Sequence, residues 1–271
     1  KKTDLESLQD ELGSYSTNAG WGDRVQNLRR AAELINGTVV MPGEEFSVEQ
    51  TTLPYTEENG YVAGSAYENG QIVESIGGGL CQVSTTLYNA VLYAELEVTQ
   101  RASHSMSVSY VDPSRDAMIA EGISDFKFVN NYDTPILIEG YIDSNNQLGF
   151  YIYGKDTRDA EHSVEFESET LETTEYTTKY VEDTEAEIGS QETEGAGMDG
   201  STARLWKVTY ENGEEVSREV INNSTYQTSD VTVKVGTKSD NAEATKLVRE
   251  AITTQDEGKI TEAISKASAL K

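Results

Sequence analysis

The residues best suited to chemistry in this sequence are a single cysteine and a histidine that follows it. Cys81 comes directly after the stretch 77–80, a glycine triplet and a leucine, at the start of a segment with helical apolar spacing. A thiol reacts as the thiolate, and both a helix N-terminus and a neighbouring imidazole lower its pKa. His104 stands on the element expected next along the chain. The pair therefore matches the layout of a thiol nucleophile with a general base, as in acyl-transfer enzymes.

A structural role is the alternative for both residues. Cys81 would then be a small buried hydrophobe, and His104 a core histidine bonded to a backbone carbonyl. An internal disulfide is excluded because the chain has one cysteine.

Two elements must position these side chains. A helix is predicted from residue 81 onward, with Cys81 in its first turn and a buried stripe formed by Val83, Leu87, Ala90 and Ala94. A strand is predicted over 103–110, because apolar residues and serines alternate there. The ring of His104 is expected to point into the domain, since it shares the apolar face with Met106, Val108 and Tyr110.

The chain around this pair reads as a mixed helix and sheet domain. A helix is predicted over 23–35, with Asp23 as its N-cap and Asn36-Gly37 as its end. Short strands flank the Pro-Gly turn at 42–43. The segments 135–143 and 148–154 are expected to form a closing β-meander around residues 144–146.

The chain after Gly154 has a different composition and residue pattern. Residues 161–200 are strongly acidic with sparse apolar positions, which indicates exposed strands, and 189–200 is expected to be a loop. The stretch 204–221 predicts a hairpin with its turn at Asn212-Gly213, and 231–236 predicts a further strand. The tail 241–270 is helical in character, with a break expected at Gly258.

Composition narrows the function. The chain has 48 acidic residues against 21 Lys and Arg, for a net charge of -27. This excludes nucleic acid as a partner, because a phosphate backbone needs a basic surface, and equally excludes docking on an anionic membrane by bulk charge. One cysteine, two histidines and no calcium-loop motif predict neither a metal site nor a cofactor. His162, in the acidic stretch, is expected to be solvated.

No apolar run approaches the roughly 18 residues that a membrane helix needs. The chain opens on Lys1, so any export signal or membrane anchor is expected upstream of it.

Several quoted stretches resemble the VanW domain over roughly Leu12 to Gly154. They are "RVQNLRRAAELINGTVVMPGEEFS", "GGGLCQVSTTLYNAVLYAELEV", "SHSMSVSY", "RDAMI" and "DFKFVNN". The resemblance implies an extracellular protein of the bacterial cell envelope and the chemistry of a peptidoglycan L,D-transpeptidase, with Cys81 as nucleophile and His104 as base. The sequence departs from the family pattern at Ala102, where a second histidine is common, and at Arg115, where a glycine is common.

The stretch from Val164 to Thr237 resembles the five-glycine (G-five) domain of Gram-positive surface proteins. "WKVTYENGEEVSREVI" is the characteristic hairpin and "VGT" the usual close. The resemblance implies an elongated β-module that binds wall glycan, and a spacer is an equal alternative. The predicted fold class is therefore α+β. Its parts are a leader or linker at 1–11, the VanW-like domain at 12–154, a linker at 155–163, the five-glycine domain at 164–237 and a helical tail at 238–271.

The resemblance implies a peptidoglycan L,D-transpeptidase that forms 3-3 cross-links through a cysteine thioester. Asp116 is the predicted orienting residue for His104, with Ser105, a backbone carbonyl or a simple capping role for the aspartate as alternatives. The residues expected to shape the substrate pocket are Gly78, Gly79, Gln82, Ser84, Arg101, Ser105 and Tyr110. Arg101 would bind a stem-peptide carboxylate with two hydrogen bonds, unless it is a plain surface arginine.

Two other functions stay open. One is hydrolysis of stem peptides by the same thiol, as a carboxypeptidase or endopeptidase. The other is non-catalytic binding to peptidoglycan. The expected partners are thus stem peptides and glycan strands, with membrane contact only through an anchor outside this sequence.

Overall fold

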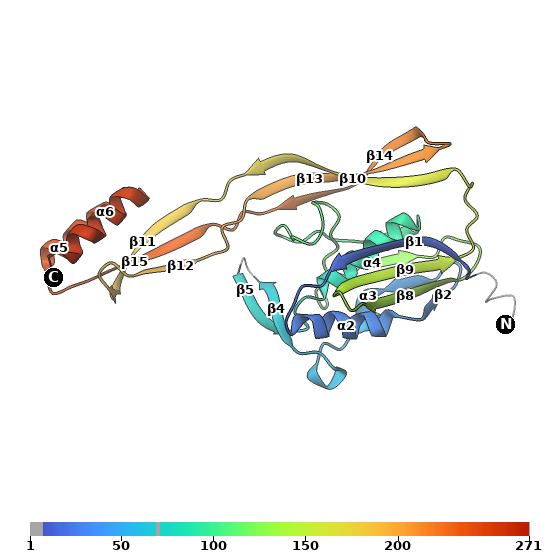
Figure 1. Cartoon of the computed structure of the whole chain (residues 1–271), viewed down its shortest axis with the longest axis horizontal. Helices are drawn as coiled ribbons and strands as arrows, with labels where there is room; N and C mark the ends of the chain where they lie inside the picture. The colour runs from blue at the N-terminus through green and yellow to red at the C-terminus, as the bar shows by residue number, and fades with distance from the viewer. Residues whose placement is uncertain (1–7, 69–70, 271) are drawn as a thin grey trace. The chain divides into compact units, whose positions relative to one another are not determined.

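The computed structural model describes residues 8–68 and 71–270. Contacts divide the chain into two compact units, whose elements are labelled in Figure 1. The first unit contains residues 8–68, 72–172 and 201–226, and the second consists mainly of residues 173–200 and 227–270. This division follows contacts and not domain types, so the predicted boundaries at 154 and 164 stay predictions. The predicted leader lies mostly outside the described residues, and its residues Asp10 and Glu11 belong to the first strand.

A four-stranded antiparallel sheet forms the centre of the first unit. Its strand order is β1 (Asp10–Asn18), β9 (Gln147–Gly154), β8 (Ile136–Ile142) and β2 (Thr38–Val40). Helix α4 (Cys81–Tyr93) packs on β1 and β9, and α2 (Arg24–Ile35) packs on β8. Both helices were predicted, as was the β8–β9 hairpin. The helix that carries the cysteine is therefore fixed against the central sheet.

The apolar stripe of α4 explains this packing. Val83, Leu87, Ala90 and Ala94 are all fully buried, as the helical spacing predicts. Gly13 of β1 allows the close approach, because a Cβ atom at this position would lie 2.3 Å from the backbone nitrogen of Ala94.

Smaller elements complete the first unit. The strands β3 (Glu45–Ser47), β7 (Lys127–Val129) and β6 (Glu97–Gln100) form a second sheet, and β4 (Ala63–Glu68) pairs with β5 (Gln71–Ile76). The short helices α3 (Val48–Thr52) and η1 (Glu57–Asn59) lie between β3 and β4 in the sequence.

The first unit also includes half of the predicted five-glycine domain. Strands β10 (His162–Thr174), β13 (Gly200–Glu211) and β14 (Glu214–Tyr226) form a three-stranded sheet. Val164, Phe166 and Leu205 of this sheet belong to the same apolar core as α4 and the central strands. Burial of apolar surface therefore joins this sheet to the VanW-like part of the chain.

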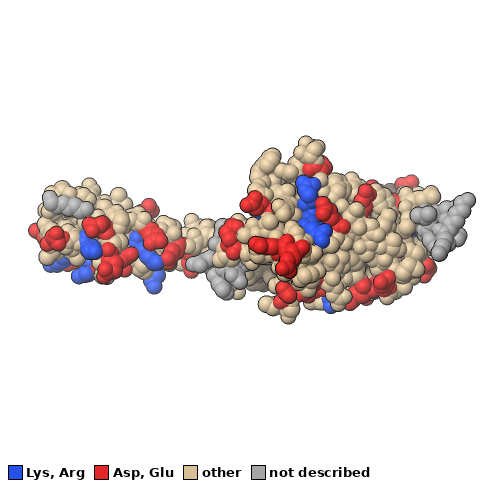
Figure 2. Space-filling model, turned by 90° about the horizontal axis from the view of Figure 1, so that it is seen from below, with Lys and Arg blue, Asp and Glu red and all other residues tan. Residues whose placement is uncertain are grey.

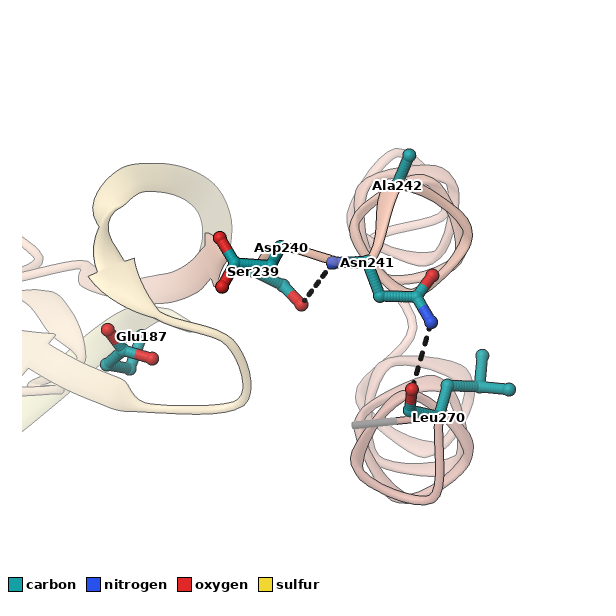
Figure 3. A pocket seen from close by; sticks show the side chains of 6 residues that line it. All are labelled: Glu187, Ser239, Asp240, Asn241, Ala242 and Leu270. Atoms are coloured by element: carbon teal, nitrogen blue, oxygen red, sulfur yellow. Dashed lines mark hydrogen bonds between the residues drawn. The ribbon is translucent and has the colours of Figure 1, made fainter.

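The second unit is a separate sheet with two helices. Strand β15 (Val231–Lys238) lies between β11 (Thr178–Glu187) and β12 (Gln191–Glu194), and α5 (Ala242–Ile252) and α6 (Glu257–Ser268) pack together. Asn241 caps α5, and its side-chain amide donates to the Leu270 carbonyl at 2.9 Å, which ties the start of α5 to the chain just after α6 beside a pocket (Figure 3). The overall class is α+β, as predicted.

The predicted strand over 103–110 is wrong, because the structure has no strand there. The segment has no strand partner, and its backbone is held by other groups. The amide of His104 donates to the Asp116 side chain at 2.7 Å, and the carbonyl of Ala102 accepts from the amide of Met118 at 2.8 Å. One side-chain and one backbone hydrogen bond to the segment 116–118 thus hold this backbone in place of a strand ladder.

Three boundary details also differ from the predictions. Asp23 precedes α2 but makes no side-chain capping bond. The stretch 189–200 includes strand β12, which pairs with β15. The break in the helical tail lies at 253–256 and not at Gly258, because Asp256 caps α6 by accepting from the amide of Lys259 at 3.0 Å.

The acidic composition is visible at the surface. On the face in Figure 2, acidic side chains are spread over both units and basic ones lie among them. Within the described residues, no helix combines the length and the apolar character needed to cross a membrane.

Candidate active site

Cys81 is the first residue of α4, directly after a turn built from the glycine triplet. A Cβ atom on Gly78 would lie 2.0 Å from the backbone oxygen of Gly64 in β4, so this position requires glycine. Gly79 has φ +98°, a conformation that also favours glycine. The sequence predicts that these glycines shape the substrate pocket. The structure adds a packing reason, since the turn that presents Cys81 is pressed against β4.

His104 and Asp116 form the tightest polar contact near the thiol. The Nδ1 atom of His104 lies 2.6 Å from Oδ2 of Asp116, and the backbone amide of His104 donates to the same oxygen at 2.7 Å. The carboxylate is 1% exposed and the imidazole 12%. Because the carboxylate accepts at Nδ1, this nitrogen carries a proton and Nε2 remains for exchange with the thiol.

The thiol of Cys81 interacts with this imidazole and keeps partial exposure. Burial acts to raise the pKa of Cys81, but the hydrogen bond and the charge of His104 outweigh it and lower the pKa. In its protonated form, the sulfur donates to the Ile119 carbonyl at 3.3 Å. One proton can therefore lie on the sulfur or on His104, and the second arrangement is the reactive thiolate–imidazolium pair.

Asp116 favours the charged form of the imidazole. Burial acts to lower the pKa of His104, but hydrogen bonds to Asp116 and Cys81 and their charges raise it to about 9. Burial likewise acts to raise the pKa of Asp116, yet the hydrogen bond and charge of His104 and further donors lower it. The three side chains form a chain of thiol, imidazole and carboxylate, the order of a nucleophile, a base and an orienting acid.

Arg101 lies against Asp116. Its Nη2 atom is 3.0 Å from Oδ1 of Asp116, its Nε donates to the Asp116 backbone carbonyl at 2.7 Å, and its side chain is 9% exposed. The guanidinium predicted to bind a substrate carboxylate is thus engaged with a carboxylate of the protein itself.

The other predicted pocket residues lie in different surroundings. Gln82 is buried and bonds Arg24, Thr17 and the Asn18 backbone, while Ser84 is buried and donates to the Ala117 carbonyl at 2.6 Å. These two side chains fasten α4 to its neighbours. Tyr110 lies near the thiol. Burial and then the charge of Cys81 raise the pKa of this tyrosine.

Ser105 is exposed beside His104 in the sequence, whereas the structure puts Asp116 and not this serine against the imidazole.

Both departures from the family pattern lie near this site. Arg115 is buried, donates to Oδ1 of Asn89 at 2.8 Å and lies 5.0 Å from the ring centre of Tyr15. The positive φ of the local turn falls on Ser114, at 69°. Ala102 is part of the irregular segment before His104, so His104 is the histidine that reaches Asp116.

Two residues that contact Asp116 or its partner Arg101 were missed by sequence reasoning. Tyr226 donates its hydroxyl to Oδ1 of Asp116 at 2.5 Å, and the hydroxyl of Ser224 accepts from Nη1 of Arg101 at 3.0 Å. Both come from β14, more than 100 positions further along the chain. The sequence gives no signal for this face, because residues 222–225 are all polar and do not alternate with apolar ones.

The prediction that His162 is solvated is wrong. Its Nε2 lies 2.7 Å from Oε2 of Glu95, its Nδ1 lies 2.7 Å from Oε1 of Glu211, and the side chain is 16% exposed. Lys207 also bonds Glu95, at 2.6 Å. This cluster joins three segments of the first unit and lacks a nucleophile. Among the described residues, no group of histidine, cysteine and acidic side chains is arranged to bind a metal ion.

Comparisons with known proteins agree with this architecture. Residues 23–153 match the family described as VanW like protein, and residues 165–238 match the G5 domain. The uncharacterized protein YoaR of Bacillus subtilis is 44% identical over 130 residues, which are 47% of this chain and 43% of the relative. The vancomycin B-type resistance protein VanW of Enterococcus faecalis is 29% identical over 153 residues, 52% of this chain and 55% of the relative.

The chain thus spans about half the length of the curated relatives it matches. A solved G5 domain of IgA1 protease is 25% identical and covers 29% of this chain and 94% of its own, with a TM-score of 0.23. The two family matches are consistent with a cell-wall-associated protein. They identify the chain as a VanW-like domain followed by a G5 domain.

Proposed function

We propose that this chain is a peptidoglycan L,D-transpeptidase that forms 3-3 cross-links through a thioester on Cys81. The observation that carries the proposal is the arrangement of Cys81 at the start of α4, His104 beside it and Asp116 at the far side of the imidazole. A half-buried thiol with a lowered pKa next to a protonatable imidazole is a nucleophile, and a purely structural cysteine needs neither feature.

The first half-reaction transfers an acyl group to the sulfur. The Cys81 thiolate attacks the carbonyl carbon that joins the L-centre of a stem residue to the terminal D-Ala, and a carbon–sulfur bond forms. When the tetrahedral intermediate collapses, the carbon–nitrogen bond breaks and the departing amine takes the proton from Nε2 of His104. The products are a thioester and free D-alanine, with His104 neutral.

The second half-reaction makes the cross-link. The side-chain amine of another stem attacks the thioester carbonyl, and neutral His104 takes a proton from this amine as the new amide forms. The carbon–sulfur bond breaks, and the thiolate–imidazolium pair is restored. Asp116 stays ionised throughout and keeps the imidazole oriented.

The VanW-like and G5 pair supports a place for this reaction at the wall. We propose an extracellular site of action, with the G5 segment as glycan binder or spacer. The stem peptide as substrate follows from the family resemblance. Water in place of the acceptor amine would turn the same thioester chemistry into hydrolysis.

Mass spectrometry of muropeptides tests the proposal. Sacculi from cells that express the parent protein are expected to contain 3-3 dimers, and those from cells with Cys81→Ala are expected to lack them. His162→Gln serves as a matched control, since it changes the other histidine of the chain. Unchanged dimers in Cys81→Ala would refute the proposal. Purified protein that releases tripeptide from a tetrapeptide stem equally well with and without an acceptor amine would instead identify a hydrolase.

A further inference from the structure

The end of strand β14 presents three alternate polar side chains to the VanW-like part of the first unit. Asn222 donates to the hydroxyl of Tyr88 at 2.6 Å, Ser224 lies 2.7 Å from the hydroxyl of Ser114, and Tyr226 bonds Asp116. Ser224 and Tyr226 are 5% and 3% exposed. Alternate residues of a strand share one face, so a single strand face reaches the surroundings of the site.

A β-bulge produces this face. The pairing of β13 and β14 shifts between Leu205 and Trp206, where Val220 pairs with Trp206 and Asn222 with Leu205. The extra residue on β14 exchanges the two faces of the strand, because side chains alternate with a period of two. Val220 is accordingly 38% exposed, whereas Ser224 is buried.

Tyr226 completes the hydrogen bonding of the Asp116 carboxylate. Oδ2 accepts from the ring and the amide of His104, while Oδ1 accepts from Arg101 at 3.0 Å and from the Tyr226 hydroxyl at 2.5 Å. The tyrosine oxygen in turn accepts from the backbone amide of Ser114 at 2.7 Å. Burial and the adjacent Asp116 charge raise the pKa of Tyr226 to about 12, so the hydroxyl remains a donor.

Ser224 forms hydrogen bonds with two residues next to Asp116, namely Arg101 and Ser114. Its hydroxyl accepts from Arg101 at 3.0 Å and lies 2.7 Å from that of Ser114, the residue with the unusual φ of 69°. The backbone that leads into Asp116 is thus fastened by β14 at two points. A buried carboxylate with four donors in fixed positions has one orientation, and here this orientation directs Oδ2 at His104.

We infer that Tyr226 and Ser224 of the G5 segment are positioning residues for the thiol site of the VanW-like segment, so that both segments contribute residues to one site. The inference rests on the proposed role of Cys81 as a nucleophile. Tyr226 and Ser224 act through Asp116 and Arg101 and do not touch the sulfur. The G5 segment therefore has a task at the site besides any glycan binding or spacing.

The rate of Cys81 alkylation by iodoacetamide, measured against pH in the full chain, tests this inference. The chain has no other thiol, so the signal belongs to Cys81 alone. Tyr226→Phe removes one hydroxyl and keeps the ring. We expect it to reduce the rate at pH 7 by about three- to tenfold, the effect of one lost hydrogen bond, and to move the rising limb of the profile to higher pH. Tyr176→Phe, the same change at a 41% exposed tyrosine, is expected to give the parent profile.

Combined substitutions test whether Tyr226 acts through Asp116. In an Asp116→Asn background, Tyr226→Phe is expected to have no additional effect on the profile. Ser224→Ala is the second variant, and we expect it to move the pH profile of alkylation in the same direction by a smaller amount. It tests the inference if Tyr226→Phe fails to fold. Parent-like profiles for both folded variants would overturn the inference, as would full additivity with Asp116→Asn.

These outcomes are separate from the fate of the proposed function. Alkylation needs no wall substrate, so the Tyr226 effect can be present even where no cross-linking occurs. Loss of the proposed function would appear instead as unchanged 3-3 dimers in Cys81→Ala.

Discussion

One oxygen of Asp116 accepts two hydrogen bonds from the same histidine. The ring Nδ1 of His104 lies 2.6 Å from Oδ2, and the backbone amide of His104 lies 2.7 Å from it. The imidazole cannot turn about its own bonds without losing the carboxylate that its backbone also holds. The orientation of Nε2 toward Cys81 is therefore set by Asp116 and by the irregular segment that carries His104.

Substitution of Asp116 by asparagine is expected to lower the pKa of His104. The hydrogen bond and charge of Asp116 help to raise this pKa to about 9, so removal of the charge should lower it by about one unit or more. NMR titration of the two histidine rings measures the change directly. Asp112→Asn, at an exposed site of the same segment, is the control and should leave both titrations in place. A His104 pKa that stays near 9 in Asp116→Asn would contradict this account.

Substitution of His104 by glutamine is expected to remove the reactive thiolate at neutral pH. Burial and the charge of Asp116 then raise the pKa of Cys81 without compensation from His104, whereas in the parent the thiolate–imidazolium pair persists up to about pH 9, where His104 loses its proton. Alkylation at pH 7 should slow by about 10- to 100-fold and recover only at high pH. His162→Gln is the matched control, because the chain has two histidines. Equal rates for the parent and His104→Gln at pH 7 would mean that His104 does not activate the thiol.

The position of Cys81 could be predicted from local sequence. A glycine triplet ends one element, and the 3–4 spacing of Val83, Leu87 and Ala90 fixes the helix that follows. The inward direction of His104 could also be predicted, although from the wrong element. Serines and apolar residues alternate there without a partner strand, so the pattern alone does not make a strand.

The residues that form hydrogen bonds with Asp116 could not be predicted in the same way. The contact between Asp116 and Tyr226 joins residues 110 positions apart. It also depends on the bulge before Asn222, because simple alternation would put Tyr226 on the same face as Val220, which is exposed. Val220, directly before this bulge, is 38% exposed, whereas Tyr226 after it is 3% exposed. Arg101 was recognised as a carboxylate binder, but the carboxylate it binds is buried in the protein.

His162 is expected to contribute stability that depends on pH. Its hydrogen bonds to Glu211 and Glu95 raise its pKa above the ordinary 6.5, with Lys207 and Arg158 as the nearby cations. Because the pKa of His162 is higher in the folded state than in the unfolded state, its protonated ring stabilises the fold fully at pH values below the unfolded pKa. This contribution is lost as the pH rises through the folded pKa. Urea unfolding should show the parent more stable than His162→Gln by about 0.5–1 kcal/mol at pH 6, with a smaller gap at pH 9. A gap that widens toward pH 9 would exclude an ion-pair role.

Substitution of Gly78 by alanine is expected to destabilise the turn that presents Cys81. The new Cβ atom would lie 2.0 Å from the backbone oxygen of Gly64, so β4 or the start of α4 must move. The free energy of unfolding should fall by about 2–4 kcal/mol, and alkylation of Cys81 should slow as the sulfur leaves His104. Gly258→Ala in α6, where the nearest atom is the capping carboxylate oxygen of Asp256 at 3.3 Å, should instead change stability by less than about 1 kcal/mol. If Gly78→Ala has the stability and reactivity of the parent, β4 can move at little cost in free energy, and the contact with Gly64 does not hold the thiol in place.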